Sequence, residues 1–279
     1  MTRTRVAALY LHPIKSAVGI EVDELTLDLH GAIGDRRWML VDVDGVAITR
    51  RELHTLTRVH PHFVHGDRNG PLRVDADGHA PLALRVPDDA PARRSRIFSD
   101  EAVVHDAGEE AARWMTAVTG RRCRVVRVAE KSGRSLQPKY IGGIVAEGRE
   151  IALSDGAPLL ILGKASIASL NDRLSASGEA AVGVERFRPN ILLDGGAAHV
   201  EDTWTAVRIG DVTIGVGSEC LRCVITTIDE RTMVQGAEPL RTLATYRRQG
   251  SGAVFGMNAT NASIGTIRVG DEVQVLGYR

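Results

Sequence analysis

Short apolar or alternating runs, separated by turn residues, fill the chain as far as about residue 98. These runs lie at residues 6–11, 20–29, 38–43 and 46–49. Their length and alternation predict strands. Asp44-Gly45 and Asp77-Gly78 stand where hairpin turns belong, because glycine tolerates the positive φ of a primed turn. The pattern predicts a β-rich first part of the chain.

A segment rich in helix formers, residues 109–119, ends at Gly120, and glycine is typical of the position that follows a helix. We expect this helix to lie between two modules, residues 1–120 and residues 121–279. A strand-like run at 123–128 follows the helix. The segment after that run contains several glycines and is typical of an extended loop.

The second half of the chain mixes apolar runs, helical spacing and short strands. The run at 158–162 is apolar enough to be buried, and apolar residues recur at helical spacing over 165–174. A further helix is predicted at 239–248, with Pro239 near its start, where a missing N–H costs little. Strands are predicted at 191–193, 206–209, 212–216, 223–228, 266–269 and 273–276. The sequence therefore predicts an α+β, mainly β fold with two β-barrel-like modules and a few packed helices.

The composition is that of a chain with a substantial core and no overall charge. Of the 279 residues, 43% are hydrophobic and 25% are charged, which suffices for one large core or two smaller ones. Lys and Arg together number 35, as do Asp and Glu, which argues against a strongly basic nucleic-acid-binding protein. We expect no nucleic-acid partner, and any recognition of charge must be local.

The apolar segments indicate neither export nor a membrane partner. The run at 6–11 is interrupted by His12, Pro13 and Lys15 before the core of a signal peptide could form. The most apolar window, 151–170, contains charged residues, glycine and proline, whereas a membrane helix needs about 20 largely uncharged residues. Three cysteines, an odd number, are typical of reduced thiols rather than of a disulfide framework. We therefore expect a cytoplasmic protein.

The pair Cys220 and Cys223 is the first feature that points to chemistry. A Cys-x-x-Cys pair can be half of a zinc site, a dithiol redox centre, or the place where one thiolate binds a soft metal. Zinc needs two further ligands, and the sequence offers no second close pair. A dithiol centre favours a helix N-terminus, whereas the β-branched run after Cys223 predicts a strand. From the spacing alone, two packing cysteines remain an open alternative.

Two further clusters have ordinary structural explanations beside chemical ones. His60, His62 and His65 invite a metal site, but the residues around them are typical of an exposed loop with solvated or capping histidines. Cys123 lies in a strand-like run with arginines on both sides. These arginines are either a docking patch for an acidic redox partner or the charged edge of a solvated strand.

Eight segments, spread from residue 10 to residue 271, match the pattern of one family in its order. They read YLHPIKS at 10–16, GDRRWM at 34–39, SDGAP at 154–158, RFRPN at 186–190, EDTW at 201–204, CLRCVITTID at 220–229, EPLRTL at 238–243 and GD at 270–271. With these segments the chain resembles the two-module MOSC proteins, the group that includes the mitochondrial amidoxime-reducing component and its bacterial relatives. The resemblance implies an N-terminal MOSC β-barrel module over 1–120 and a MOSC domain over 121–279.

The resemblance also implies a molybdenum cofactor, Mo-molybdopterin, with Cys223 as the protein ligand of the metal and Cys220 not a ligand. A soft thiolate suits molybdenum, and Arg222 beside the cysteine would favour the deprotonated form. The residues that the resemblance places around the cofactor are Lys15, Ser16, Arg36, Gly156, Ala157, Arg188, Asn190, Leu221, Arg222 and Asn258. Three cations that converge on a phosphate suit an anionic cofactor, although each cation taken singly is explained as well by an ordinary surface charge.

The chain departs from the family pattern at several positions. Gly156 and Ala157 stand where animal relatives usually carry a hydroxyl residue, so contacts there are expected only from backbone N–H groups. Asn258 replaces an aromatic residue, which puts the size and polarity of the substrate entrance in question. We expect neither a membrane anchor before the first motif nor an iron–sulfur domain after the last one, so electrons are expected from another protein.

These implications predict an oxidoreductase that reduces N-hydroxylated or N-oxide compounds by oxygen transfer to molybdenum, with Cys223 as the catalytic ligand. Its expected partners are a small N-oxygenated substrate and an electron-donor protein that carries flavin, haem or an iron–sulfur cluster. Direct use of a nicotinamide is not expected, because the sequence lacks a Gly-x-Gly-x-x-Gly strand-turn-helix unit. The alternative is a molybdenum-cofactor carrier or a sulfur-transfer protein that passes on a cysteine persulfide.

Overall fold

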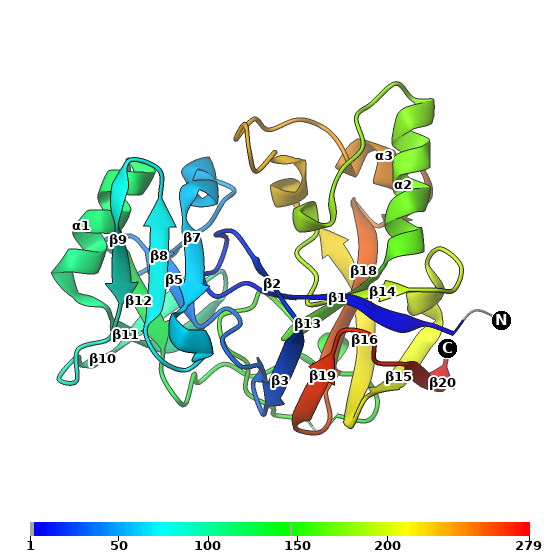
Figure 1. Cartoon of the computed structure of the whole chain (residues 1–279), viewed down its shortest axis with the longest axis horizontal. Coiled ribbons are helices and arrows are strands. Elements are labelled where there is room, and N and C mark those ends of the chain that lie inside the picture. The colour runs from blue at the N-terminus through cyan, green and yellow to red at the C-terminus, as the bar shows by residue number, and fades with distance from the viewer. Residues whose placement is uncertain (1–2, 146) are drawn as a thin grey trace.

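Strands dominate the computed structural model, which describes residues 3–145 and 147–279 (Figure 1). The expected first module begins at residue 1, and its residues 1 and 2 lie outside the described residues, as does residue 146 of the second. Within the described ranges the chain forms 20 strands and three α-helices. The predicted mainly β class is therefore confirmed.

The largest sheet has nine strands, most of them from the second half of the chain. They are β1 (Arg5–Leu11), β2 (Ile20–Val22), β13 (Leu159–Gly163), β14 (Ile191–Asp194), β15 (Trp204–Ile209), β16 (Val212–Arg222), β17 (Arg248–Gln249), β18 (Gly252–Asn261) and β20 (Val273–Tyr278). Their order is β2-β1-β14-β13-β18-β16-β15-β20, with β17 paired to β18. The Val6 N–H donates to Asp271 O and the Val273 N–H to Thr4 O, each at 2.9 Å. The start of β1 thus meets the start of β20, and the sheet nearly closes into a barrel.

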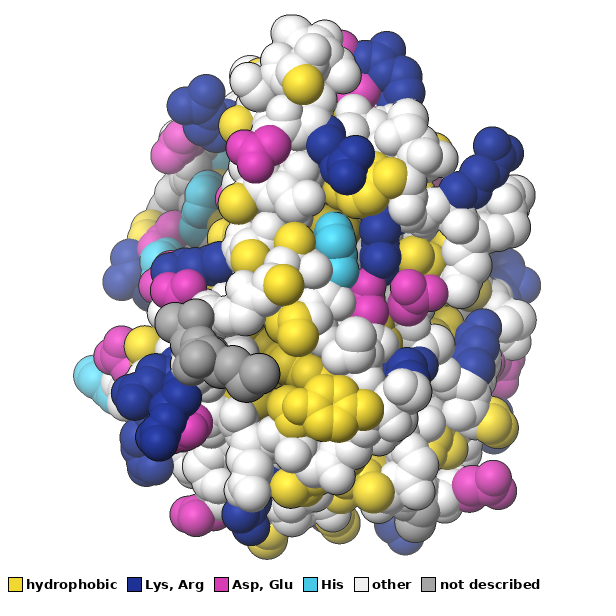
Figure 2. All heavy atoms as spheres, turned by 90° about the vertical axis from the view of Figure 1, so that its right-hand side faces the viewer, with side chains coloured by type: hydrophobic (Ala, Val, Ile, Leu, Met, Phe, Trp, Pro, Cys, Tyr) yellow, Lys and Arg dark blue, Asp and Glu magenta, His cyan; other side chains and the backbone are white. Residues whose placement is uncertain are grey.

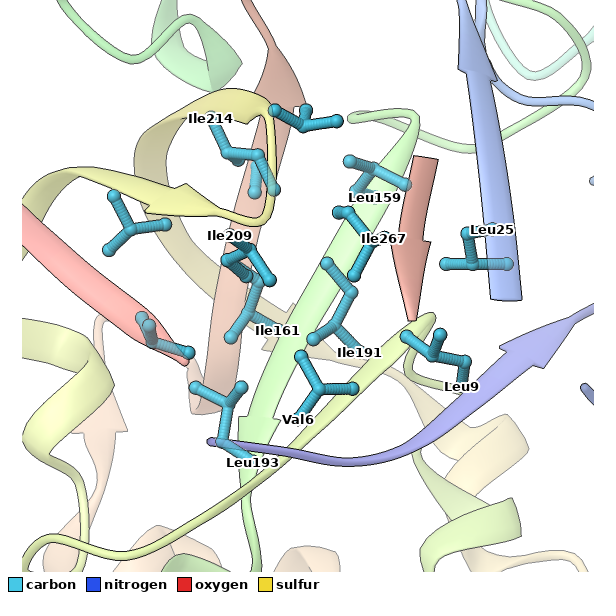
Figure 3. Close-up of a cluster of buried hydrophobic side chains, with 14 of the residues drawn as sticks. Val6, Leu9, Leu25, Leu159, Ile161, Ile191, Leu193, Ile209, Ile214 and Ile267 are labelled. Carbon is cyan, nitrogen blue, oxygen red and sulfur yellow. The ribbon is translucent and has the colours of Figure 1, made fainter. Parts of the chain in front are cut away.

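One apolar cluster fills the interior of this barrel. Figure 3 shows Val6 of β1, Ile161 of β13, Ile191 and Leu193 of β14, and Ile209 of β15 pointing toward one another. None of these five side chains is more than 2% exposed. Because a one-residue slip would turn a strand's apolar set outward, this cluster fixes the register of the strands around it.

A second group of strands comes from the first half of the chain. They are β5 (Trp38–Val41), β6 (Ala47–Ile48), β7 (His60–Phe63), β8 (Leu72–Ala76), β9 (His79–Leu84), β10 (Ala92–Ile97), β11 (Asp100–Asp106) and β12 (Arg124–Val128). A five-stranded sheet has the order β10-β11-β12-β5-β6, and a three-stranded sheet has the order β7-β8-β9. Helix α1 (Gly108–Thr119) contributes Met115 to the same buried cluster as Leu40 of β5 and Val74 of β8. These strands and α1 therefore share a core.

The first strands of the chain belong to the sheets of its second half. Strand β1 pairs antiparallel with β14. Strand β3 (Glu24–Asp28) lies between β4 (Gly31–Ala32) and β19 (Gly265–Arg268). In Figure 1, β1 accordingly runs beside β14, away from β5 and β8. The chain crosses between the two groups of strands more than once, and the module boundary expected near residue 120 stays a prediction.

The predicted helices are confirmed, with small differences at their ends. Helix α1 ends at Thr119, and its C-cap Gly120 adopts a left-handed φ of 74°. Helix α2 (Lys164–Ala176) covers the predicted 165–174, and α3 (Leu240–Tyr246) begins directly after Pro239. Across 3–145 and 147–279, none of the helices combines the length and apolar character needed to cross a membrane. Positive and negative side chains are interspersed on the face that Figure 2 shows, in keeping with the balanced charge.

The strand predicted at 223–228 is wrong. Strand β16 ends at Arg222, and Val224–Thr227 form one turn of 3₁₀ helix with Cys223 at its N-cap. The hydroxyl of Thr226 donates to Cys223 O at 3.0 Å, and that of Thr227 to Val224 O at 2.8 Å. These local hydrogen bonds compete with a strand ladder and here replace it.

Three other segments also differ from the prediction. The predicted loop around His60 and His62 is strand β7, although both side chains are exposed. The run at 20–29 divides into β2 and β3. The sequence pattern does not indicate strand β18, because glycine and asparagine interrupt its apolar residues. Its burial over nearly its whole length instead reflects its central place in the nine-stranded sheet.

Candidate functional site

A cavity of about 390 Å³ lies where early segments of the chain meet the end of β16 and the turn after it. The predicted site residues that line it are Lys15, Ser16, Arg36, Gly156, Ala157, Arg188, Leu221, Arg222, Cys223 and Asn258. Asn190 is fully buried and lies behind the wall. The fold thus brings together residues from both halves of the chain that the sequence analysis grouped only by resemblance.

Lys15 holds a buried ammonium group at the cavity wall. Its backbone N–H donates to Trp38 O at 2.7 Å, which anchors the segment on β5. Its Nζ donates to Leu153 O at 2.9 Å and pairs with the Asp155 carboxylate. Burial lowers the pKa of Lys15, against the opposing charge of Asp155. Burial alone would raise the pKa of Asp155, but the Lys15 charge holds it below its ordinary range.

Arg36 is fixed by a buried network with Asn190 at its centre. Asn190 Oδ1 accepts from Arg36 Nη1 at 3.1 Å and from the Leu160 N–H at 3.2 Å. The Asn190 amide donates to Asp35 Oδ1 at 3.1 Å, and Asp35 also pairs with Arg36. Asn190 therefore acts on the cavity by positioning Arg36 rather than by facing the cavity itself.

The guanidinium group of Arg188 has hydrogen-bonding capacity that its neighbours do not fully use. Its Nη1 donates to Ala17 O, and its Nη2 has no hydrogen-bond partner among the described residues. Burial, followed by the charges of Arg50 and Arg36, lowers the pKa of Arg188 to about 9. Arg50 is 1% exposed and pairs with Glu230. Arginines gathered in this way favour the binding of an anion, because an anion relieves their mutual repulsion.

Three residues of the cavity wall hold a left-handed backbone. Ser16, Arg36 and Arg188 have φ of 68°, 46° and 55°. This conformation costs a residue with a side chain about 1–2 kcal/mol, and such strain gathers at ligand sites. Arg50 compensates for it at Ser16, because its guanidinium donates to Ser16 O at 2.9 Å and to Ala17 O at 3.0 Å.

The two cysteines of the site have different neighbours. Irregular pairing of β16 with β18 on both sides of Glu219 bends the strand just before the motif, and such bulges redirect side chains. Arg222 Nη1 donates to Cys220 Sγ at 3.0 Å, whereas Arg51 Nη2 lies 3.7 Å from Cys223 Sγ. The expected pairing of Arg222 with Cys223 is therefore corrected. Residues two apart on a strand share a face, which directs Arg222 to Cys220.

Leu221 and Asn258 lie at different depths of the cavity. Leu221 is 59% exposed and presents an apolar side chain at the surface. Asn258 is 8% exposed and sits on β18 opposite Leu160. The Asn258 amide donates to Glu219 O at 3.2 Å, so this donor is hydrogen-bonded within the wall.

Several buried polar atoms of the cavity wall have no partner among the described residues. They are Ser154 Oγ, Arg188 Nη2 and Arg222 Nε. A buried polar group without a hydrogen bond costs about 1–3 kcal/mol, and a bound group with acceptor oxygens would satisfy the two guanidinium atoms. Together with the Cys223 thiol they form a donor set that fits an anionic cofactor with a soft metal. No cluster of three or more His, Cys, Asp or Glu able to hold a metal ion occurs in 3–145 or 147–279.

The sequence analysis missed two residues that border the site. The Arg51 guanidinium lies 4.8 Å from the centre of the Phe98 ring and 3.5 Å from Asp155 Oδ2. Tyr140 covers Gly156, where an added β-carbon would lie 2.6 Å from the Tyr140 Cζ. The expectation that Gly156 and Ala157 contact the cofactor only through backbone N–H groups stays a prediction. The pair Arg50-Arg51 after a predicted strand was a weak indication that Arg51 belongs to the site. The predicted loop gave no such indication for Tyr140.

The histidine cluster and Cys123 contribute no residue to the cavity wall. His62 is exposed, with its Nε2 3.2 Å from the Asp75 carboxylate. Cys123 is 3% exposed, and burial raises the pKa of its thiol. Arg121 and Arg124 beside it pair with carboxylates of this chain. These pairs argue against a docking patch, and β12 is not an edge strand either, because β11 and β5 flank it.

His12, next to this site, gives the protein a defined dependence of stability on pH. The side chain is 3% exposed, and its Nε2 lies 3.0 Å from Pro189 O. Burial, followed by the charges of Arg188 and Arg36, keeps the pKa of His12 well below 6.5. The unfolded chain therefore takes up a proton near pH 6.5 that the folded chain does not. The stability from neutral His12 is complete above that pH and is lost below it, by about 1.4 kcal/mol per pH unit.

We expect the His12→Gln variant to lack this part of the dependence, because glutamine can donate to Pro189 O but does not titrate. Denaturant unfolding of both proteins at about pH 7.5 and pH 5 measures the difference. Equal losses of stability between the two pH values in both proteins would contradict the assignment to His12.

Two family models match the chain, and together they cover most of it. The one described as "MOSC N-terminal beta barrel domain" matches residues 3–122, and the one described as "MOSC domain" matches residues 148–274.

Curated proteins similar to the chain extend this match. "Mitochondrial amidoxime reducing component 2" of Rattus norvegicus is 34% identical over 285 residues, which cover 96% of this chain and 82% of that protein. "Mitochondrial amidoxime-reducing component 1" of Homo sapiens is 33% identical over 288 residues, with 98% and 83% covered. "Molybdenum cofactor sulfurase" of Drosophila mojavensis is 30% identical over 260 residues, which cover 91% of this chain but 32% of that protein.

Proposed function

The chain belongs to the MOSC-domain family, and from this premise we propose that it binds a molybdenum cofactor in the cavity and reduces N-hydroxylated or N-oxide compounds. The observation that carries the proposal is the convergence of Lys15, Arg36 and Arg188 with the Cys223 thiol on one cavity. Relatives named for amidoxime reduction, similar over nearly the whole chain, support the choice of reaction.

Each group of the cavity has a distinct task in this proposal. Lys15, Arg36 and Arg188 bind the phosphate of the cofactor, because guanidinium forks and an ammonium suit its oxygens. Cys223 offers one thiolate to the metal, and the Arg51 guanidinium at 3.7 Å stabilises negative charge on that sulfur. Cys220 is not a ligand, since its thiol faces Arg222.

When bound, a molybdenum cofactor supplies two-electron chemistry in which an oxygen atom leaves the substrate. Reduction of an amidoxime to an amidine takes up two electrons and two protons and releases water. The residues of the chain hold the reacting groups, and the exposed Leu221 offers an apolar surface for the body of a substrate.

Purification of the full chain from a host that makes the cofactor tests the proposal. We expect molybdenum and pterin in amounts near one per chain, and oxidation of a reduced dye when benzamidoxime is added. Protein that is folded but contains neither molybdenum nor pterin would overturn the proposal.

The electron donor and the location of the protein belong to the same proposal. A separate protein that carries flavin, haem or an iron–sulfur cluster supplies the electrons. A cytoplasmic location stays a prediction, and the amidoxime-reducing relatives carry the word mitochondrial in their names.

The chain alone is expected not to use a nicotinamide. Among the described residues no strand-turn-helix unit carries the glycine pattern that binds a dinucleotide. Benzamidoxime reduction by the purified, molybdenum-loaded chain should therefore occur with a reduced dye and not with NADH or NADPH. Steady turnover with NADH and the purified chain alone is the result that would contradict this prediction.

A second candidate function is sulfur transfer or cofactor delivery. It is favoured by the similarity to a protein named molybdenum cofactor sulfurase, which covers 91% of this chain. In that case a cysteine persulfide is the working group, and cyanide should release sulfur from the protein as thiocyanate. Releasable sulfur without benzamidoxime turnover would favour this candidate over the reductase.

A further inference from the structure

Tyr140 enters the cavity wall from the segment that joins β12 to β13. It ends a one-turn 3₁₀ helix, Pro138–Tyr140, in which the Tyr140 N–H donates to Gln137 O at 2.9 Å. The segment lies directly on β16, because a β-carbon at Gly217 would be only 2.5 Å from Tyr140 O. A glycine at 217 therefore permits the close approach that fixes the Tyr140 backbone.

The ring of Tyr140 occupies the place of a side chain at position 156. A β-carbon on Gly156 would lie 2.6 Å from the Tyr140 Cζ, 2.8 Å from Cε2 and 2.9 Å from Cε1. The nearest of these atoms is Cζ, which bears the hydroxyl group. The phenol end of the ring, rather than its attached end, thus lies over Gly156 in the cavity wall between Asp155 and Ala157.

We propose that the Tyr140 hydroxyl donates a hydrogen bond to the cofactor bound in this cavity. It thereby supplies the hydroxyl group that the chain lacks at positions 156 and 157. The inference rests on the proposed function, since the ligand is the same molybdenum cofactor. It adds a cofactor-binding residue that lies outside every motif of the sequence.

The surroundings of Tyr140 support a donor directed at an anionic group. The adjacent Lys139 ammonium lies 4.8 Å from the centre of the ring, and Lys139 also lines the cavity. Ser154, two residues before Gly156, also lines the cavity, and its Oγ is buried without a partner among the described residues. A bound group with acceptor oxygens would therefore find three donors in this part of the wall, from Lys139, Tyr140 and Ser154.

The first test removes only the hydroxyl. The Tyr140→Phe variant keeps the ring on Gly156, so the fold and the shape of the cavity are preserved. Loss of one neutral hydrogen bond should raise the rate of molybdenum and pterin loss during dialysis about 2- to 12-fold. The matched control is Tyr278→Phe on β20, where the tyrosine is 69% exposed and lines no part of the cavity. It should retain the cofactor as the wild type does.

The second test moves the hydroxyl to position 156. The Gly156→Ser variant alone should push the Tyr140 ring out of the wall, because the two side chains need the same space. In the double variant Tyr140→Ala with Gly156→Ser, the serine hydroxyl has that space, and retention should exceed that of Tyr140→Ala. Gly156 is not among the residues with a left-handed φ, so serine is tolerated there by the backbone.

The outcomes separate this inference from the proposed function. Wild-type protein without molybdenum overturns both. Wild-type loading with equal retention in Tyr140→Phe and Tyr278→Phe overturns the role of Tyr140 alone. Faster loss in Tyr140→Phe, together with recovery in the double variant, supports it.

Discussion

The Cys223→Ala variant is expected to lose reductase activity altogether, whereas Cys220→Ala should keep most of it. If Cys223 ligates molybdenum, its removal takes away a thiolate bound to the metal and changes the metal's spectrum and potential. The phosphate contacts of the cationic wall can still hold some cofactor, so activity should fall further than molybdenum content does. Dye-linked benzamidoxime reduction, normalised to molybdenum, measures the effect.

The structure makes Cys220 a closely matched control. Both cysteines line the same cavity and both are partly buried, but Cys220 is held by Arg222 and Cys223 lies beside Arg51. A dithiol centre would lose activity with either substitution, and packing cysteines would lose only stability. Thermal melts must show that both variants fold, because a cysteine-to-alanine change costs on the order of 1 kcal/mol in a buried site. Equal loss of activity in two folded, cofactor-loaded variants would defeat the assignment.

The Arg188→Ala variant is expected to retain molybdenum about ten- to more than a hundredfold more weakly than the wild type. One charge-assisted contact to the phosphate is worth about 1.5 to 3 kcal/mol. Arg188 offers such a contact, since its Nη2 is buried without a partner among the described residues. Molybdenum content after extended dialysis checks the prediction.

Two further variants separate the charge of Arg188 from its backbone. Arg188 has a φ of 55°, so Arg188→Ala keeps the backbone strain of the wild type, whereas Arg188→Gly removes the side chain and relieves that strain. Arg188→Ala and Arg188→Gly should both lose molybdenum. Arg208→Ala, which removes an exposed arginine that bonds Gln274 on the barrel surface, should not. Wild-type retention in folded Arg188→Gly protein would count against the phosphate contact.

The sequence by itself determined the class of fold and the family. Alternating runs and Asp-Gly turns place strands correctly at β5, β6, β8 and β9, because strand period and turn chemistry are local properties. The helix at 109–119 was also predictable from local sequence, since its end depends on Gly120. The resemblance grouped the predicted site residues, and all of them except Asn190 line one cavity in the structure.

Only the tertiary structure decided how these pieces meet. Strand β18 forms despite its glycine and asparagine because burial between β13 and β16 outweighs weak propensity. Residues 224–227 turn away from the predicted strand because threonine hydroxyls bond the preceding carbonyls. Arg51 meets Cys223 from a distant part of the chain, and Tyr140 lies over Gly156 because the segment between β12 and β13 folds back on itself. Contacts of this kind depend on how sheets pack rather than on local sequence, so no pattern of neighbouring residues could predict them.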